Sequence, residues 1–251
     1  MQKERIKIIV LAGGKGHRMQ SELPKVLMPV KGKVMIKHLL ESVAKSGIDL
    51  EPSIVVGYGK EAVLKELGKN YEYIIQKEQL GTGHAVLCTR EHLENKAEHV
   101  LVLYGDHPFV SAETIKKLAD IHLKSGKNIT MGTVKLPDFL DWREFFYHNF
   151  SRIVRNEKGE IIKDVQFKDT NEEEKSITEV DPCYFCFKAE WLWKKLQTLK
   201  NDNAQKEYYL TDLVKIAMAE SSGIKSIDIA PREGLGANSK KELEILEKFA
   251  P

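Results

Sequence analysis

The chain of 251 residues has no long hydrophobic run. The longest apolar run in its N-terminal region, from Ile8 to Ala12, is five residues long, whereas a transmembrane helix needs about 20. The opening sequence MQKERIKIIV carries charges but no apolar stretch of signal-peptide length. We therefore expect no membrane partner.

Cysteine is also scarce, with only Cys88, Cys183 and Cys186. Three cysteines cannot build a disulfide framework, which favours a reducing, cytoplasmic location. Cys183 and Cys186 form a C-x-x-C pattern, but inside an expected strand, whereas a redox pair normally opens a helix. No second cysteine pair is present for zinc. We expect these cysteines to be structural.

An excess of one charge sign is missing as well. Lys and Arg number 39 against 37 Asp and Glu, for a net charge of +2. Nucleic-acid binders usually show a basic excess or a basic stripe, so we expect no nucleic-acid partner. Apolar residues make up 42% and charged residues 30%, which is typical of a globular chain. Small anionic ligands need only local positive charge and remain candidates.

Strand and helix patterns alternate through the first half. Continuous apolar runs predict strands, and 3.6-residue spacing predicts the helices between them. The expected strands are 6–11, 53–57, 73–76 and 100–104, and the expected helices are 34–46, 61–67, 82–93 and 111–124. Gly47 fits a helix C-terminus, and Thr82 and Ser111 fit helix N-caps. This alternation predicts an α/β fold with a parallel sheet.

The second half is more mixed. It predicts a hairpin around Gly159 and ends in a helix that begins with a capping box from Ser239 to Glu242. An exposed loop is expected over 169–175. The remaining expected elements are strands 128–134 and 178–187, hairpin strands 153–156 and 161–167, and helices 189–199 and 209–219.

A glycine-rich loop, from Leu11 to Met19, follows the first strand directly. Glycines let backbone N–H groups approach phosphate oxygens, and Lys15, Arg18 and Lys25 add positive charge. The loop matches neither the Walker A pattern nor the dinucleotide fingerprint. An ordinary tight turn is the alternative, with Lys25 on a surface turn.

A second glycine-rich segment, QKEQLGTGH, runs from Gln76 to His84. The Gln76 amide can both donate and accept, which suits the edge of a nucleobase. Gly81 and Gly83 would present backbone N–H groups. The alternative is a structural loop capped by Thr82.

Two candidate metal ligands stand far apart in the chain. Asp106 ends a Tyr104-Gly105-Asp106 motif at the carboxyl end of a strand, where open α/β sheets bind ligands. A carboxylate there suits Mg²⁺, although a helix cap or a turn is equally compatible with it. Asn238 could cap the last helix or offer its carbonyl oxygen to a metal, and Ser239 heads the better cap. His84 and His107 are expected to be structural.

In combination, these motifs resemble the sugar-1-phosphate nucleotidyltransferases, or NDP-sugar pyrophosphorylases. The likeness is greatest to the N-acetylglucosamine-1-phosphate uridylyltransferase domain of a bifunctional bacterial enzyme, and it covers nearly the whole chain. The ordered motifs are the glycine loop with Arg18 and Lys25, QLGTGHA, YGD, SRIVR, NAQ-x-EYYLTD and a final G-x-N. By residue pattern alone, the NAQ-x-EYYLTD segment predicts only the start of a helix.

The resemblance implies a Rossmann-like, mostly parallel sheet with a small β-rich sugar lobe. It implies one domain over 1–251, with a nucleotide half (about 1–127), an acceptor half (about 128–238) and a C-terminal helix (239–251). It implies transfer from UTP to a sugar 1-phosphate with release of pyrophosphate. The implied roles are catalysis by Arg18 and Lys25, nucleotide binding by Leu11, Ala12, Gly13, Gly14, Gln76, Gly81 and Thr82, acceptor binding by Tyr104 and Gly105, and Mg²⁺ binding by Asp106 and Asn238.

Three departures from the family pattern fall on the acceptor side. Ser151 replaces a glycine, Gln166 replaces a glutamate, and Asp181-Pro182-Cys183 replaces Asn-Thr-Gly. Transfer chemistry is therefore expected to be intact while the acceptor stays open. UDP-N-acetylglucosamine is one expected product. Another hexose 1-phosphate, a polyol phosphate or phosphocholine is the alternative acceptor, and a non-catalytic nucleotide-sugar-binding protein is the other alternative. The sequence holds no hexapeptide repeats, so we expect no acetyltransferase activity from it.

Overall fold

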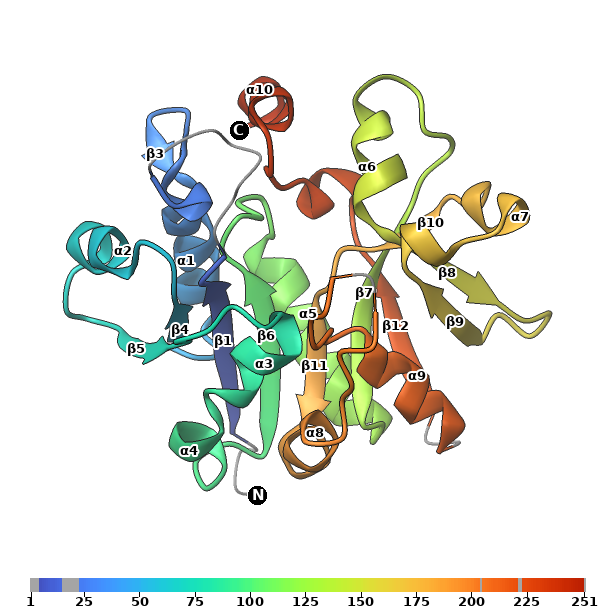
Figure 1. The fold of residues 1–251 in the computed structure, drawn as a ribbon, viewed down its shortest axis with the longest axis horizontal. Helices are drawn as coiled ribbons and strands as arrows, with labels where there is room; N and C mark the ends of the chain where they lie inside the picture. The colour runs from blue at the N-terminus through green and yellow to red at the C-terminus, as the bar shows by residue number, and fades with distance from the viewer. Residues whose placement is uncertain (1–4, 15–22, 204, 221–222, 251) are drawn as a thin grey trace.

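A ten-stranded sheet forms the centre of the computed structural model, which describes residues 5–14, 23–203, 205–220 and 223–250 (Figure 1). Strands β5, β4, β1 and β6 are parallel, β11 is antiparallel to β6 and β7, and β12 is parallel to β7. The expected α/β fold with a mostly parallel sheet is confirmed. The order is β5 (Glu72–Ile75), β4 (Ser53–Val56), β1 (Ile6–Ala12), β6 (His99–Tyr104), β11 (Phe185–Lys188), β7 (Ile129–Lys135), β10 (Glu179–Asp181), β8 (Ser151–Arg155) and β9 (Ile161–Val165), with β12 (Ile224–Asp228) beside β7.

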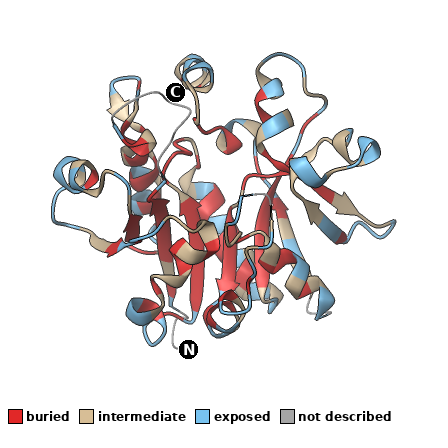
Figure 2. Ribbon diagram, viewed as in Figure 1, coloured by how far each residue is buried: buried red, intermediate tan, exposed pale blue. Residues whose placement is uncertain are grey.

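Helices cover both faces of this sheet because its central strands are apolar on both sides. Alternate residues of β1 enter two different clusters: Ile8 and Val10 pack with helices α1 (Met35–Ser46) and α5 (Ala112–Ser125). Ile9 and Leu11 pack on the other face with α3 (Thr82–Leu87) and α8 (Ala189–Leu196). Figure 2 shows the central strands buried between these layers. A continuous apolar run is what such a two-sided position requires.

The expected helix ends are largely as the sequence predicts. Gly47 follows α1 with φ 64°, and the Ser111 side chain accepts from the backbone N–H of Thr114 at the start of α5. Ser239 caps α10 (Lys240–Phe249) by accepting from Glu242 N at 3.3 Å. The Glu242 carboxylate accepts from Asn238 N, so the reciprocal half of the capping box lies one residue earlier than expected. The short elements are α2 (Lys60–Leu67), the 3-10 turns at Lys25–Leu27, Asp141–Arg143, Phe167–Asp169 and Pro231–Gly234, and the ribbon of β2 (Pro29–Val30) and β3 (Lys33–Val34).

The helix expected over 82–93 is wrong in two respects. It is divided into α3 and α4 (Arg90–Leu93), because the buried Thr89 hydroxyl donates to Val86 O at 2.7 Å and the chain turns there. Its N-cap is Gly81 rather than Thr82. The Thr82 hydroxyl instead accepts from the backbone N–H of Leu210 at 3.0 Å. A tertiary contact therefore takes the side chain that local pattern assigns to a cap.

Four other expected elements differ. The strand over 178–187 is two strands, because Pro182 lacks an N–H and Cys183 has φ 66°. The loop over 169–175 contains a one-turn helix, α7 (Glu172–Lys175), which is stabilised by a capping box of Asn171 and Glu174. The helices over 189–199 and 209–219 are shorter, ending at Leu196 in α8 and beginning at Asp212 in α9 (Asp212–Ala219).

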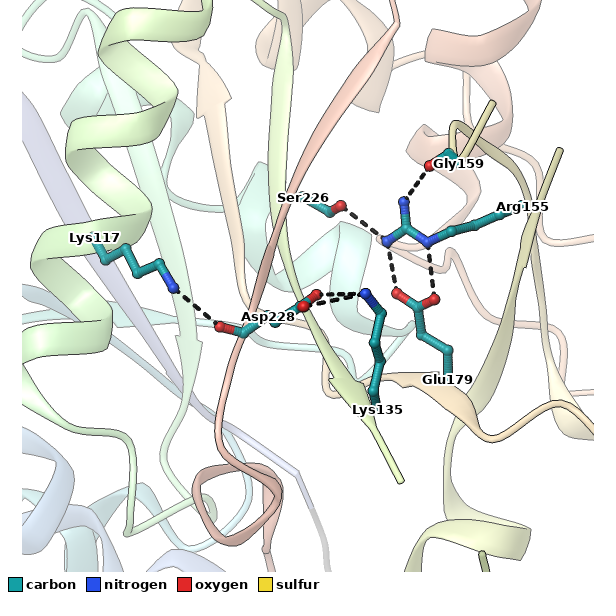
Figure 3. Close-up of polar contacts among 7 residues, drawn as sticks. All are labelled: Lys117, Lys135, Arg155, Gly159, Glu179, Ser226 and Asp228. Atoms are coloured by element: carbon teal, nitrogen blue, oxygen red, sulfur yellow. Dashed lines mark hydrogen bonds and ion pairs between the residues drawn. The ribbon is translucent and has the colours of Figure 1, made fainter. Parts of the chain in front are cut away.

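The β8–β9 hairpin, β10, α6 (Glu144–Asn149) and α7 lie together at one side of the molecule (Figure 1). Arg155 of β8 joins this lobe to the main sheet (Figure 3). Its guanidinium donates to both carboxylate oxygens of Glu179 at 2.8 and 2.6 Å, to Gly159 O at 2.7 Å and to Ser226 Oγ of β12 at 3.0 Å. The hydrogen bond to Ser226 thereby adds a side-chain contact to the pairing of β10 with β7, which makes the lobe continuous with the sheet.

In the described part of the chain, none of the helices combines the length and the apolar character that crossing a membrane requires. Cys88, Cys183 and Cys186 are free thiols. Cys183 lies in the bend before β11 and Cys186 within that strand, away from any helix start.

Candidate active site

A cavity of about 350 Å³ lies at the carboxyl ends of β1, β5 and β6. Because these strands are parallel, segments distant in sequence meet at this edge. The lining residues are Leu11, Gly13, Gly14, Lys25, Gln76, Gln79, Gly81, Thr82, Ala85, Tyr104, Asp106 and Glu207. The structure thus gathers most of the residues expected to bind a nucleotide. Arg18 lies outside the described residues.

The glycine loop passes very close to a neighbouring chain segment. A Cβ on Gly13 would stand 3.0 Å from Gln76 Oε1 and 3.3 Å from Gly57 N. Gly13 O accepts from Tyr58 N at 3.1 Å, so this backbone is fixed from both sides. Ala12 is buried beneath the cavity rather than in its lining. A side chain at position 13 would therefore crowd Gln76 and Gly57, so the glycine has a packing role in addition to the approach to phosphate that the sequence predicts.

Gln76 is buried, and its amide is already engaged. Nε2 donates to Gly81 O at 3.1 Å and lies 3.2 Å from His84 Nδ1. Gln79 Nε2 donates to the main-chain oxygen of Gln76 at 3.1 Å and also lines the cavity. The Gln76 side chain therefore shapes the loop that carries Gly81. Gln79 is a second amide in the lining.

The NAQ-x-EYYLTD segment docks on this loop, which residue pattern alone did not predict. Gly83 N donates to Tyr208 O at 2.8 Å, and Tyr208 N donates to Leu80 O at 2.8 Å. Gly81 has φ 107°, and a Cβ there would stand 2.6 Å from Tyr208 O. The docking brings Glu207 into the cavity wall, where burial raises the pKa of its carboxyl group.

Lys25 lies between the two expected metal ligands. Its ammonium is 2.5 Å from Asp106 Oδ2 and donates to Asn238 Oδ1 at 2.8 Å. Burial alone would raise the pKa of Asp106, but the charge and the hydrogen bond of Lys25 hold the pKa below its usual value. Three groups from distant parts of the chain therefore converge at the cavity.

This donor set fits Mg²⁺. A carboxylate oxygen and an amide carbonyl oxygen are hard ligands, and both here accept from one ammonium, so they are aimed at a common cation position. Two protein ligands would leave coordination positions for phosphate oxygens and water, which is how Mg²⁺ is usually held in such sites.

His107 holds the backbone on the far side of Asp106. The Tyr184 hydroxyl donates to Glu233 O at 2.7 Å, so it accepts from His107 Nδ1 at 2.8 Å. Burial lowers the pKa of His107 to about 4, which keeps the ring neutral. A Cβ on Gly236 would collide with the His107 ring, so the chain leading to Asn238 packs directly on it. His107 therefore has the structural role that the sequence predicts.

The expected acceptor residues are spread over three places. Gly105 is packed against Leu11 O beneath the cavity. Tyr104 lines the cavity, and burial, with Cys183 and Asp181 nearby, raises the pKa of its hydroxyl group well above the usual value. Ser151 and Asp181 are directly paired between β8 and β10, and both are buried. Gln166 lies apart from them, where its Nε2 donates to Thr211 Oγ1 at 3.0 Å.

The residues that sequence reasoning missed are Gln79, Ala85 and Glu207 in the cavity lining and Asp164 beside Asp181. Gln79 and Ala85 stand inside the QLGTGHA motif, and Glu207 inside EYYLTD. Their membership of these motifs is the signal that could have identified them. Asp164 carries no such signal, because it lies in an ordinary hairpin strand.

The fold and this cavity define a class of protein. Residues 8–209 match the family model of the MobA-like NTP transferase domain. The chain belongs to this family of enzymes, which confirms the resemblance seen in the motifs.

Among curated proteins, the chain is similar to the bifunctional protein GlmU of several bacteria. It is 40% identical to that of Brevibacillus brevis over 248 residues, covering 98% of this chain and 51% of that protein. It is 39% identical to that of Geobacillus thermodenitrificans over 243 residues, covering 96% and 51%. The chain thus spans about half the length of these relatives.

Two solved structures share the fold. One is a Bacillus anthracis protein assigned as a glucose-1-phosphate thymidylyltransferase, in complex with a sucrose, with a TM-score of 0.76, 18% identity and coverage of 98% of this chain and 95% of that one. The other is a CMP:2-keto-3-deoxy-manno-octonic acid synthetase complexed with CTP, with a TM-score of 0.69, 15% identity and coverage of 98% of both chains.

Proposed function

We propose that the chain catalyses Mg²⁺-dependent transfer of a nucleotidyl group from UTP to a sugar 1-phosphate, releasing pyrophosphate. The observation that carries the proposal is the convergence of Lys25, Asp106 and Asn238 at the glycine-lined cavity. Each is a charged or polar group suited to phosphate or Mg²⁺, and each comes from a different part of the chain. The free thiols fit the expected cytoplasmic location.

The reaction requires no covalent bond to the protein. An oxygen of the acceptor phosphate attacks the α-phosphorus of the nucleotide. The bond from that phosphorus to the oxygen bridging the β-phosphate breaks, and pyrophosphate leaves with the electron pair. The protein contributes by placing the two substrates in line and by stabilising charge.

Each element of the cavity has a part in this chemistry. Backbone groups at Gly13 and Gly14 approach the phosphates, and the Gln76–Gly81 loop with Gln79 borders the place of the base. Lys25 supplies positive charge, for which its ammonium must leave Asp106 and Asn238. The resemblance to the family implies the same role for Arg18. Mg²⁺ held by Asp106 and Asn238 would neutralise phosphate charge.

The test is pyrophosphate release from the purified chain with each of UTP, CTP, GTP and ATP, against N-acetylglucosamine 1-phosphate and other phosphorylated acceptors. We expect release with UTP and at least one acceptor, and loss of release when EDTA removes Mg²⁺. Release that depends on no acceptor would contradict the proposal, because water rather than a phosphorylated acceptor would then be the nucleophile. No release with any pair of substrates would also contradict it and would favour a non-catalytic nucleotide-sugar-binding protein.

The acceptor side favours a second candidate within the same chemistry. Asp181 is a buried carboxylate where the family pattern has an asparagine amide, and Gln166 is engaged with Thr211. Such a site offers a different set of donors and acceptors to the sugar. Another phosphorylated alcohol is therefore a candidate acceptor.

A further inference from the structure

The lobe formed by the β8–β9 hairpin, β10, α6 and α7 is called the acceptor lobe below. Three polar side chains share one face of it. Asp181 of β10 is paired with Ser151 of β8. Asp164 of β9 is paired with Ile153, which lies two residues beyond Ser151 and so on the same face of β8. The register of the three strands thus brings Ser151, Asp164 and Asp181 together, and we call them the acidic cluster.

Most side-chain oxygens of the acidic cluster are buried and have few hydrogen-bond partners outside the cluster. Asp181 is 1% exposed and Ser151 is 3% exposed. Asp181 Oδ1 accepts from Cys183 N at 2.6 Å. Within the described part of the chain, Asp181 Oδ2, both carboxylate oxygens of Asp164 and Ser151 Oγ are buried with no hydrogen bond of normal geometry. Unsatisfied buried polar atoms of this number are unusual and point to a ligand.

Among the described residues, the carboxylates of Asp164 and Asp181 have no cationic partner. By contrast, Lys25 is paired with Asp106, and Arg155 is paired with Glu179. Burial raises the pKa of both groups, that of Asp164 to about 6, with the Asp212 carboxylate adding to the rise for Asp164. The neighbouring Asp164 raises the pKa of Asp181 further. Two buried carboxylates side by side are stabilised either by sharing a proton or by binding a cation.

The acidic cluster adjoins the cavity. Tyr104 lines the cavity, and its hydroxyl is close enough to Cys183 and Asp181 that both raise its pKa. A ligand whose phosphate lies at Lys25 and Asp106 can therefore extend past Tyr104 toward Asp181. A ligand that reaches these carboxylates from the cavity can compensate their charge with an amino or ammonium group of its own.

We propose that the acceptor carries a positively charged amino or ammonium group, and that Asp181 and Asp164 bind this group while Ser151 accepts from it where it bears N–H. This inference rests on the proposed function, since it names the class of acceptor for the same transfer. Gln166 donates to Thr211 and carries no charge, so recognition of a cationic group is assigned to the acidic cluster alone.

The experiment compares kcat/KM for acceptors that differ in charge. Glucosamine 1-phosphate is set against N-acetylglucosamine 1-phosphate and glucose 1-phosphate, and phosphocholine and phosphoethanolamine against glycerol phosphate. We expect a cationic acceptor to exceed its neutral partner by about tenfold or more, as for a close buried charge pair. The two sets distinguish an amino sugar from an amino alcohol as the source of the charge.

Variants test the assignment to these residues. Asp181→Asn and Asp164→Asn should each reduce the preference for the cationic acceptor by about tenfold. Asp120→Asn on the exposed side of α5 is the matched control and should leave the preference unchanged. Both cluster variants should melt at or above the temperature of the unaltered protein, since a like-charge pair is relieved. If either variant melts at a lower temperature than the unaltered protein, the proposal is judged on the acceptor preference of the unaltered protein alone.

The outcomes separate the two proposals. Pyrophosphate release with neutral acceptors, and no preference for cationic ones, overturns this inference and leaves the proposed function standing. An unaltered preference in both folded variants also overturns it. The absence of release with every nucleotide and acceptor contradicts the proposed function itself.

Discussion

At the scale of single residues, the buried charges of this protein differ in how they are compensated. Asp49 accepts from Lys7 Nζ at 2.7 Å and from Ile8 N at 2.8 Å, far from the cavity. Asp106 is paired with Lys25, and its surroundings depress its pKa. Asp164 has no such partner among the described residues. These environments predict different consequences when each carboxylate is neutralised.

Asp106→Asn should retain the fold and lose turnover. The change is nearly isosteric at a strand end, but it removes the anionic oxygen expected to bind Mg²⁺. We expect kcat to fall about 10²-fold or more, which is about 2.7 kcal/mol of barrier. Asp49→Asn is the control, because it removes an equally buried, lysine-paired carboxylate and should lower stability without changing kcat. Near-normal turnover of Asp106→Asn at saturating Mg²⁺ would exclude a main ligand role.

The pKa of Asp164 predicts a pH-dependent stability. Burial raises that pKa from 3.8 to about 6, with the Asp212 charge adding to the rise, while Ser151 and Asp181 oppose it. The folded state therefore keeps this proton to higher pH than the unfolded chain does. The stabilisation is complete below about pH 4 and is lost as pH rises through about 6.

Asp164→Asn has no proton to lose, so it should gain stability relative to the unaltered protein as pH rises, by about 2 kcal/mol at pH 7.5. Urea unfolding of both proteins at intervals from about pH 4.5 to 7.5 measures this difference. A difference that stays constant across the series would show that Asp164 titrates normally.

At the scale of elements, the acceptor lobe continues the sheet through the pairing of β10 with β7, and Arg155 adds side-chain contacts to this connection. Arg155 binds Glu179 with two hydrogen bonds and reaches Ser226 on β12, so it joins three strands (Figure 3). The pKa of Arg155 is raised, mainly by its hydrogen bond to Glu179. The nearby pair of Lys135 and Asp228, at 3.1 Å, is more exposed. The two pairs form a natural comparison.

Arg155→Met should therefore destabilise the protein more than Lys135→Met does. Removing Arg155 leaves the half-buried Glu179 carboxylate without its partner, at an expected cost of about 3 kcal/mol. The exposed pair of Lys135 should contribute about 0–1 kcal/mol. Denaturant unfolding of the two variants measures the contrast. Equal losses would mean that the lobe is not held through Arg155.

At the scale of the whole molecule, the cavity depends on segments more than 100 residues apart. The loop of Gly81 to Gly83 and the segment of Tyr208 to Leu210 exchange backbone and side-chain hydrogen bonds. Lys25 and Asn238 meet across the same region. The segments around the cavity are thus parts of one packed unit.

Gly81→Ala should disturb this docking. The residue has φ 107°, and the new Cβ would stand 2.6 Å from Tyr208 O. We expect a loss of stability well above the roughly 1 kcal/mol typical of Gly→Ala at positive φ, together with weaker binding of the nucleotide. Gly126→Ala is the matched control, because Gly126 has φ 63° but no atom within 4 Å of the new Cβ. Equal losses would show that the Tyr208 contact contributes nothing.

Much of the fold and of the nucleotide side could be predicted because its determinants are local in sequence. The apolar runs of β1 and β6, the helix ends at Gly47 and Ser111, and the glycines next to strand ends act within a few residues. Since parallel strands end at one edge of the sheet, local motifs placed at those ends also converge in space.

The tertiary structure decided what depends on contacts between distant residues. The Thr82 hydroxyl accepts from Leu210 N rather than capping a helix, and Gln76 donates to Gly81 O. Glu207 lines the cavity because its segment docks there. The acidic cluster has its second carboxylate in Asp164, which only the register of β8, β9 and β10 brings beside Asp181. Strand pairing is set by packing of the whole sheet, so local sequence does not contain it.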